Sequence, residues 1–263
     1  MHNDLPPETR VVVAMDHGLH WGVHPGFENP EETLRTVLQA NPDGVLASVA
    51  LFRRFSELFD RHSSVQRIAT LDLIHESTTP GVREDGEVHT QVTSVEEAAR
   101  VGVDAVKVAL VYGRADESVL RDNLSFAAEI GTACRAVGLP FVVEPTLWGT
   151  QITDDLNLDR LADAARISFE LGADIVKSPY PGSGADFGSI AAQLPTPVYI
   201  AGGPAVDADR DVFEMAATAV EAGARGVMFG RNIWQRDQPA PMIDGLRTVV
   251  SGTGSVDEAC AKL

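Results

Sequence analysis

The sequence is poor in lysine and poor in positive charge overall. Lysine occurs only as Lys107, Lys177 and Lys262, and the remaining basic residues are arginine. Against 38 acidic residues there are 21 lysines and arginines, so the formal net charge is −17. A surface that binds nucleic acid needs a basic stripe, which this composition does not supply. We therefore expect no nucleic-acid partner.

Cysteines and long apolar runs are also scarce. Cys134 and Cys260 lie far apart in helical patterns, which indicates neither a disulfide framework nor a zinc cluster. No run approaches the roughly 18 apolar residues of a membrane span. The first residues, MHNDLPPETR, lack the basic start and apolar middle of a signal peptide. These features predict a soluble, cytoplasmic protein without a membrane partner.

Short β-branched runs alternate with longer amphipathic stretches along the whole chain. This alternation is typical of parallel strands joined by crossover helices, and closed barrels of about 250 residues form one domain. We predict an α/β fold, a (β/α)8 TIM barrel that is a single domain over residues 1–263. The predicted strands are 10–15, 44–49, 67–73, 105–111, 141–144, 175–177, 198–201 and 226–229, and the clearest helices are 30–39, 116–137, 158–171, 209–222 and 239–250.

A repeated phrase supports the barrel. GVDAVK (102–107), GADIVK (172–177) and GARGVM (223–228) each place a glycine at a helix end and then begin a buried strand. An open doubly wound sheet is the alternative, but no GxGxxG turn follows the first strand. Pro80-Gly81 and neighbouring charges predict an excursion at residues 77–91, a hairpin over the third strand.

Lys177 is the first candidate for chemistry, because it ends an apolar strand and active sites of TIM barrels lie at the carboxyl ends of the strands. Burial there disfavours the ammonium and frees the amine as a nucleophile that forms imines. The structural alternative is a lysine that reaches solvent or pairs with a carboxylate. Lys107 stands earlier in its strand, so we expect it to face the helices or the lower barrel; facing inward, it would add positive charge near Lys177.

Carboxylates follow two other strands. Asp16 and Glu144 can bind substrate hydroxyls or relay protons, although Asp16 could instead cap the next turn and Glu144 could form a structural salt bridge. His17, His20 and His24 cluster after the first strand, but no compact set of carboxylates or cysteines completes a metal site. We expect no metal.

The last two strand ends predict a phosphate site. Gly202 and Gly203 allow backbone amides to approach a ligand, and Gly230 with Arg231 begins a short helix. Barrels often bind phosphate with the loops after strands seven and eight, which is where these residues lie.

Several motifs together resemble a known family. MDHG (15–18), GADIVK (172–177) with Tyr180 and Gly182, IAGGP (200–204) and GARGVMFGRNIW (223–234) are similar in order and spacing to archaeal-type class I fructose-bisphosphate aldolases, the DhnA or DeoC/FbaB-like Schiff-base aldolases. The resemblance implies a TIM barrel, a Schiff base on Lys177, proton transfer assisted by Asp16, and phosphate held by Gly202, Gly203, Gly230 and Arg231. It implies no metal or cofactor, and a homo-oligomer.

One position departs from the family. Its aldolases carry an acid/base tyrosine after the fifth strand, where this chain has Thr146, and a hydroxyl of threonine cannot replace a phenol as an acid. Either Glu144, Tyr112 or Tyr180 takes that role, or the substrate differs. His17, Lys107, Tyr112 and Thr146 are further candidates for substrate binding.

We therefore predict a class I aldolase that cleaves or forms a ketose phosphate, such as fructose 1,6-bisphosphate or fructose 1-phosphate, in glycolysis or gluconeogenesis. Dihydroxyacetone phosphate would form the imine. The family also holds an amino-dideoxy-heptulosonate synthase and a thiolase for phosphorylated autoinducer-2, which are alternatives. A non-catalytic barrel that binds phosphosugars, and an isomerase or synthase that uses Asp16 and Glu144 without an imine, are the other hypotheses.

Overall fold

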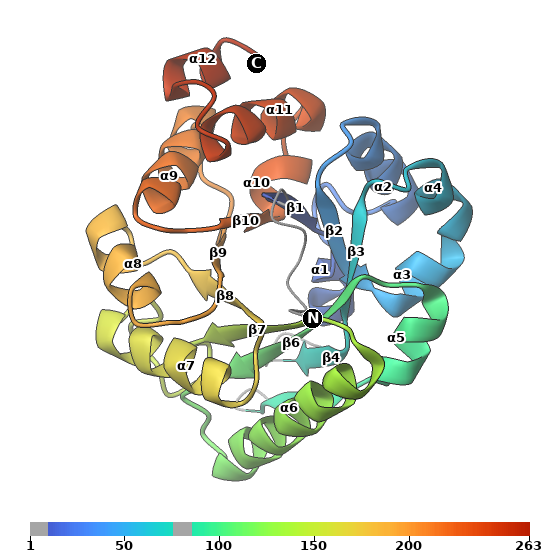
Figure 1. Cartoon of the computed structure of the whole chain (residues 1–263), viewed down its shortest axis with the longest axis vertical. Helices are drawn as coiled ribbons and strands as arrows, with labels where there is room; N and C mark the ends of the chain where they lie inside the picture. The colour runs from blue at the N-terminus through green and yellow to red at the C-terminus, as the bar shows by residue number, and fades with distance from the viewer. Residues whose placement is uncertain (1–9, 76–85) are drawn as a thin grey trace.

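The computed structural model describes residues 10–75 and 86–263, and a closed parallel barrel lies at its centre (Figure 1). The barrel order is β1-β2-β3-β6-β7-β8-β9-β10, with β10 pairing back onto β1. The predicted TIM-barrel fold is confirmed. Its strands are β1 (Val11–Ala14), β2 (Gly44–Ser48), β3 (Gln66–Thr70), β6 (Ala105–Val111), β7 (Phe141–Thr146), β8 (Ile175–Pro179), β9 (Val198–Ala201) and β10 (Gly226–Phe229).

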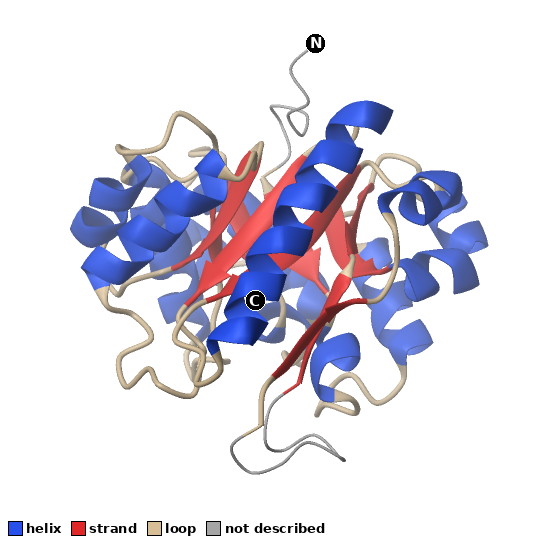
Figure 2. Ribbon diagram, turned by 90° about the horizontal axis from the view of Figure 1, so that it is seen from below, coloured by secondary structure: helices blue, strands red, loops and turns tan. Residues whose placement is uncertain are grey.

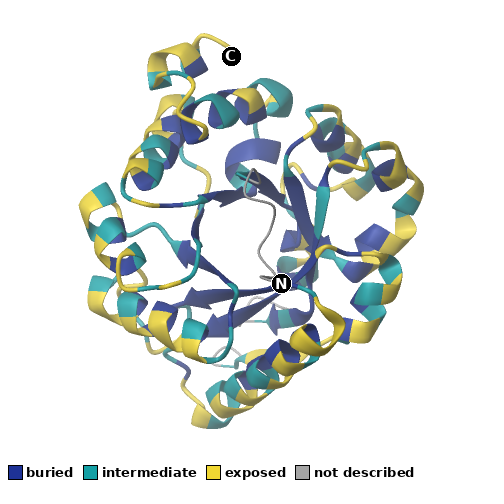
Figure 3. Ribbon diagram, viewed as in Figure 1, coloured by how far each residue is buried: buried dark blue, intermediate teal, exposed yellow. Residues whose placement is uncertain are grey.

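Helices surround the barrel, and most of them turn their buried residues toward it (Figures 2 and 3). Local chemistry sets their ends: Asn29 accepts a hydrogen bond from the Glu32 amide at the start of α2, and Gly102 ends α5 in the left-handed region. The helices are α1 (His17–Trp21), α2 (Pro30–Gln39), α3 (Val49–Arg54), α4 (Ser56–Arg61), α5 (Val95–Val101), α6 (Glu117–Val137), α7 (Leu158–Glu170), α8 (Gly184–Ala191), α9 (Asp209–Glu221), α10 (Arg231–Trp234), α11 (Pro239–Val250) and α12 (Val256–Cys260).

Both cysteines lie in helices. Cys134 is buried in α6 and Cys260 is half-buried in α12, and both thiols are free. Within residues 10–75 and 86–263, we find no helix with the length and apolar character of a membrane span.

The interior of the barrel is built in layers by the period-two alternation of its strands. A lower layer is apolar and receives a side chain from every barrel strand; its members are Val12, Ala14, Leu46, Ile68, Ala105, Val142, Ile175, Tyr199 and Met228. Two residues further along β3, β6, β7 and β8, the next inward position is polar, as Thr70, Lys107, Glu144 and Lys177. The sequence therefore places a charged layer directly above an apolar floor.

This alternation corrects the expectation that Lys107 faces the helices. Lys107 is two residues after Ala105, which belongs to the apolar floor. Its side chain therefore also points into the barrel, at the level of Glu144. The four apolar residues after Lys107 made it look remote from the site. The β6 strand is simply long, and its carboxyl half rises past the polar layer.

The predicted third strand, 67–73, is also corrected. The barrel strand β3 ends at Thr70, and Asp72 begins a separate strand, β4 (Asp72–His75), which pairs antiparallel with β5 (Val88–Gln91). Figure 2 shows this hairpin where the red strands lead into the grey trace. An excursion was predicted at 77–91, and it begins earlier; residues 76–85 lie outside the described part.

Candidate active site

A cavity of about 1270 Å³ opens at the carboxyl ends of the barrel strands. Its walls come from segments far apart in the chain, including α1, the loops after β7 and β8, and the loops after β9 and β10. Most of the predicted site residues line it, namely Asp16, His17, Lys107, Glu144, Lys177, Tyr180, Gly202, Gly203, Gly230 and Arg231.

Glu144 bridges the two buried lysines. Its Oε1 atom lies 2.7 Å from Nζ of Lys177, and its Oε2 atom lies 2.7 Å from Nζ of Lys107. The three side chains are at most 7% exposed. Lys107 also lies 3.4 Å from Oδ2 of Asp16, whereas Lys177 has Glu144 as its one ion-pair partner among the described residues.

Burial and charge act in opposite directions on this cluster. Burial opposes ionisation of Glu144, but Lys107 and Lys177 outweigh it and lower the pKa of Glu144 to about 2. Burial likewise opposes the charge of Lys107, yet Glu144, Asp16 and Asp72 raise the pKa of Lys107 above its ordinary value. Glu144 is therefore an anion and Lys107 a cation at neutral pH.

Three side chains contact one carboxylate oxygen of Asp16, Oδ2. Thr70 Oγ1 donates to Oδ2 of Asp16 at 2.7 Å, with Lys107 Nζ at 3.4 Å and His20 Nε2 at 3.5 Å from the same oxygen. Burial would raise the pKa of Asp16, but Lys107, His20 and Lys177 lower it well below its usual value. Asp16 stands at the N-cap of α1 without a side-chain capping bond, so its carboxylate serves the cavity and does not cap the helix.

His17 lies beside Asp16 as a neutral ring. Burial, with the positive charges of Lys177 and Arg231, lowers the pKa of His17 to about 3 although Asp16 opposes this. The ring packs edge-on against Trp234, whose indole nitrogen donates to the carbonyl of Ala14. A Cβ atom at Gly230 would collide with Cε1 of His17 and with the carbonyl oxygen of Ala14, so only glycine fits there.

The predicted phosphate segment is held together by Asn232. This buried side chain donates to the carbonyls of Gly202 and Pro204 and accepts from the amide of Val206, which ties the loop after β9 to α10. Arg231 follows Gly230 and lies over the ring of Trp21 at 5.8 Å. Its Nε atom is buried and has no hydrogen-bond partner in the described part of the chain.

The tyrosine candidates are placed differently. Tyr180 lines the cavity and its hydroxyl bonds with Oγ1 of Thr218 at 3.0 Å. Tyr112 packs against the outer core and burial raises its pKa; it is not among the residues that line the cavity. Thr146 is fully buried on β7, and its hydroxyl has no partner among the described residues.

Sequence reasoning did not find three residues that shape the site. Thr70 could have been found from the strand alternation that also places Lys107 and Glu144. His20 was noticed only as a metal-site candidate, and Asn232 only as part of a motif. The contacts of His20 and Asn232 join segments far apart in the chain, so no local signal marks them.

A closed parallel barrel with a buried lysine pair and two carboxylates at its carboxyl end defines a class, the TIM-barrel enzymes. Comparisons with known proteins narrow this class. Residues 10–236 match the model of a DeoC/LacD family aldolase. The chain therefore belongs to the DeoC/LacD family of aldolases, and the resemblance predicted from the motifs is confirmed.

Three relatives illustrate the family. A class 1 fructose-bisphosphate aldolase of Halobacterium salinarum is 37% identical, over 96% of this chain and 94% of the relative. A 2-amino-3,7-dideoxy-D-threo-hept-6-ulosonate synthase of the same species is 28% identical, over 99% and 94%. A solved archaeal fructose-1,6-bisphosphate aldolase, with its catalytic lysine bound to a carbinolamine intermediate, is 27% identical with a TM-score of 0.81, over 93% of this chain and 94% of that one.

Proposed function

We propose that this protein is a class I aldolase that cleaves and forms a ketose phosphate through an imine on Lys177, with dihydroxyacetone phosphate as the imine-forming partner. The observation that carries the proposal is the bridge Lys107–Glu144–Lys177 in the barrel cavity. It supplies a reactive amine, a proton acceptor beside that amine, and a second cation that holds the acceptor in its ionised form.

The contacts favour Lys177 over Lys107 as the nucleophile. Lys107 lies within ion-pair distance of both carboxylates, and the same carboxylates raise its pKa, so it stays an ammonium. Lys177 has a single carboxylate contact and stands beside Pro179 and Tyr180, which line the cavity. The amine that is least committed to ion pairs is the one that can lose a proton and attack.

The proposed reaction begins when Lys177 gives a proton to Glu144 and its neutral amine adds to the ketone carbon. Loss of water from the carbinolamine leaves a protonated imine, and Glu144 accepts and returns the protons that move at this nitrogen. The C3–C4 bond then breaks, and its electron pair enters the imine to form an enamine. Asp16 takes the proton of the C4 hydroxyl as the aldehyde leaves, with Oδ1 as the oxygen that Thr70, Lys107 and His20 do not engage.

Release completes the cycle. Asp16 returns the proton that it took from the C4 hydroxyl to C3 of the enamine, water hydrolyses the imine, and dihydroxyacetone phosphate leaves. In this proposal the phosphate binds Arg231 and the backbone at Gly202, Gly203 and Gly230, which is supported by the buried, unpartnered Nε of Arg231 among the described residues. Tyr180 lines the cavity, and in this proposal its phenol supplies the acid that the family's tyrosine supplies and Thr146 cannot.

The test is reduction with borohydride in the presence of dihydroxyacetone phosphate, followed by intact mass and peptide mapping. Because the chain has three lysines, the position of an adduct is unambiguous. We expect one adduct, on Lys177, and none in Lys177→Met. Retained turnover in Lys177→Met, or an adduct on Lys107, would contradict the assignment.

The family's amino-dideoxy-heptulosonate synthase activity is the second candidate, and the loss of the tyrosine at Thr146 favours a changed substrate. Both reactions give a borohydride adduct, so product analysis separates them. If no phosphorylated carbonyl gives an adduct while the protein still binds sugar phosphates, the hypothesis of a non-catalytic barrel that binds phosphosugars is favoured.

A further inference from the structure

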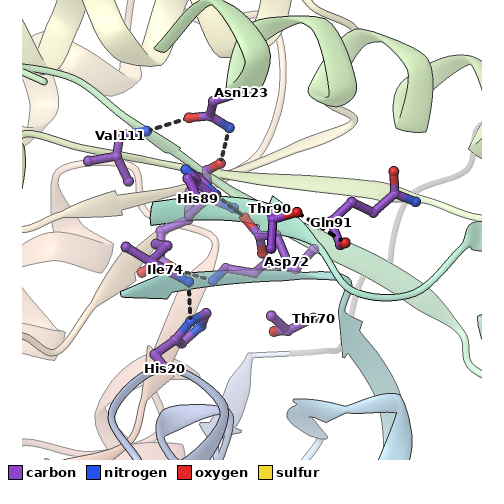
Figure 4. A network of polar contacts seen from close by, with 12 residues as sticks. His20, Thr70, Asp72, Ile74, His89, Thr90, Gln91, Val111 and Asn123 are labelled. Atoms are coloured by element: carbon purple, nitrogen blue, oxygen red, sulfur yellow. Dashed lines mark hydrogen bonds and ion pairs between the residues drawn. The ribbon is translucent and has the colours of Figure 1, made fainter. Parts of the chain in front are cut away.

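His20 connects the β4–β5 hairpin to the active site. The amide of Ile74, in β4, donates a hydrogen bond to Nδ1 of His20 at 3.3 Å (Figure 4). A backbone amide can only donate, so Nδ1 must be the unprotonated nitrogen and the ring hydrogen must be on Nε2. Nε2 lies 3.5 Å from Oδ2 of Asp16, and both side chains are about 5% exposed.

The hairpin that supplies this amide is itself anchored to the barrel. Asp72 Oδ2 accepts from His89 Nε2 at 2.7 Å and from the amide of Ala109, in β6, at 2.8 Å (Figure 4). Arg114 lies 3.2 Å from Nδ1 of His89, and since arginine only donates, His89 also carries its hydrogen on Nε2. The side chains of Asp72 and His89 are fully buried. Hydrogen bonds shielded from solvent therefore join β4 to β5 and to β6.

We propose that His20 is a positioning residue for Asp16, and that the β4–β5 hairpin sets it through the amide of Ile74. With the opposite tautomer, a nitrogen lone pair would face the carboxylate and repel it. With the hydrogen on Nε2, His20 joins Thr70 and Lys107 around Oδ2 of Asp16, which leaves Oδ1 for the substrate hydroxyl. This inference rests on the proposed function, in which Asp16 takes the C4 proton.

The experiment compares His20→Phe with His20→Gln, using fructose 1,6-bisphosphate and fructose 1-phosphate as substrates. Phenylalanine keeps the ring but removes both polar atoms. Glutamine can accept from the Ile74 amide and donate to Asp16. Loss of the polar contact between Nε2 and the charged Asp16 predicts that kcat of His20→Phe falls by about tenfold to a hundredfold. We expect KM to stay within about threefold and kcat of His20→Gln to stay close to the parent value.

His24→Phe is the matched control, because His24 follows the same helix and contacts Gln235, while the phenyl ring can keep the edge-on contacts that His24 makes with His17 and Trp234. It should leave kcat unchanged. In His20→Phe, the borohydride adduct of dihydroxyacetone phosphate should still form on Lys177, because Glu144 and Lys177 keep their contacts. This readout separates loss of Asp16 positioning from loss of folding.

Each other outcome decides against the inference. An unchanged kcat in His20→Phe, or equal losses in the phenylalanine and glutamine variants, would show that His20 does not act through Asp16. Loss of the adduct in His20→Phe would show that His20 supports Lys177 or the fold as a whole, which contradicts a role through Asp16 alone. If the parent protein forms no adduct or cleaves neither ketose phosphate, the proposed function fails, and this inference falls with it.

Discussion

Replacing each buried lysine with methionine should separate stability from catalysis. Lys107 neutralises two carboxylates, at 2.7 Å from Glu144 and 3.4 Å from Asp16, so Lys107→Met leaves two buried anions short of a partner. Removing one partner of a buried ion pair costs about 3–5 kcal/mol. In Lys177→Met, Glu144 keeps Lys107, and the loss in the free energy of unfolding should not exceed about 2 kcal/mol.

The pH dependence of this difference follows from Glu144. Its pKa is about 2 in the folded protein and 4.5 ordinarily, so its contribution to stability is present above pH 4.5 and is lost as the pH falls toward 2. At 1.36 kcal/mol per unit this contribution is about 3 kcal/mol, and Lys107 and Lys177 share it. The gap between the parent protein and Lys107→Met should therefore be largest near neutral pH and should shrink below pH 4.5.

Urea unfolding at pH 7 and pH 4 measures both variants on the same scale. Activity should show the reverse order, because Lys177→Met abolishes turnover and the borohydride adduct while its fold survives. Equal destabilisation of the two variants at pH 7, or a gap that widens at pH 4, would refute the reasoning that Lys107 is the structural cation of the layer.

Three further perturbations test other parts of the site. Gly230→Ala should destabilise the protein by about 1–3 kcal/mol, because its Cβ would meet His17 and the Ala14 carbonyl, whereas Gly188→Ala in α8, with ordinary contacts, should be neutral or stabilising in the same urea assay. His17→Phe should flatten the fall in stability between pH 7 and pH 5 by about 2 kcal/mol, since unfolded His17 takes up a proton below pH 6.5 and the folded ring does not. Arg231→Ala should raise KM for a phosphorylated ketose by about tenfold or more with a smaller change in kcat; an unchanged KM would remove Arg231 from the phosphate site.

The barrel and much of the candidate site were predictable because both follow from local patterns. Alternation of strands and helices predicts the fold, and carboxyl strand ends predict where Asp16, Glu144 and Lys177 gather. The orientation of Lys107 was predictable in principle, because Ala105 and Lys107 share a face of β6. The four apolar residues after Lys107 suggest that Lys107 lies low in the barrel. They show only that strand β6 is long.

The hairpin and its contacts were less accessible from the sequence. A single strand over residues 67–73 looks continuous, since apolar residues recur along the run and it lacks a glycine or proline. The break after Thr70 depends on pairing with β5, about 16 residues away, and on the buried bond between Asp72 and His89. Such long-range pairing leaves no periodic pattern in the sequence. The bounds of the hairpin and the contacts of His20 could therefore not be predicted.

The closed floor of the barrel has a consequence for the order of events. Nine apolar side chains, with Tyr199 the largest fully buried one, seal the interior just below the two lysines. Substrate and products therefore reach and leave Lys177 through the opening at the carboxyl ends of the strands. In the proposed reaction, the fragment bound to Lys177 lies at the bottom of this cavity, so we expect the free aldehyde to leave before it and, in synthesis, to bind after it.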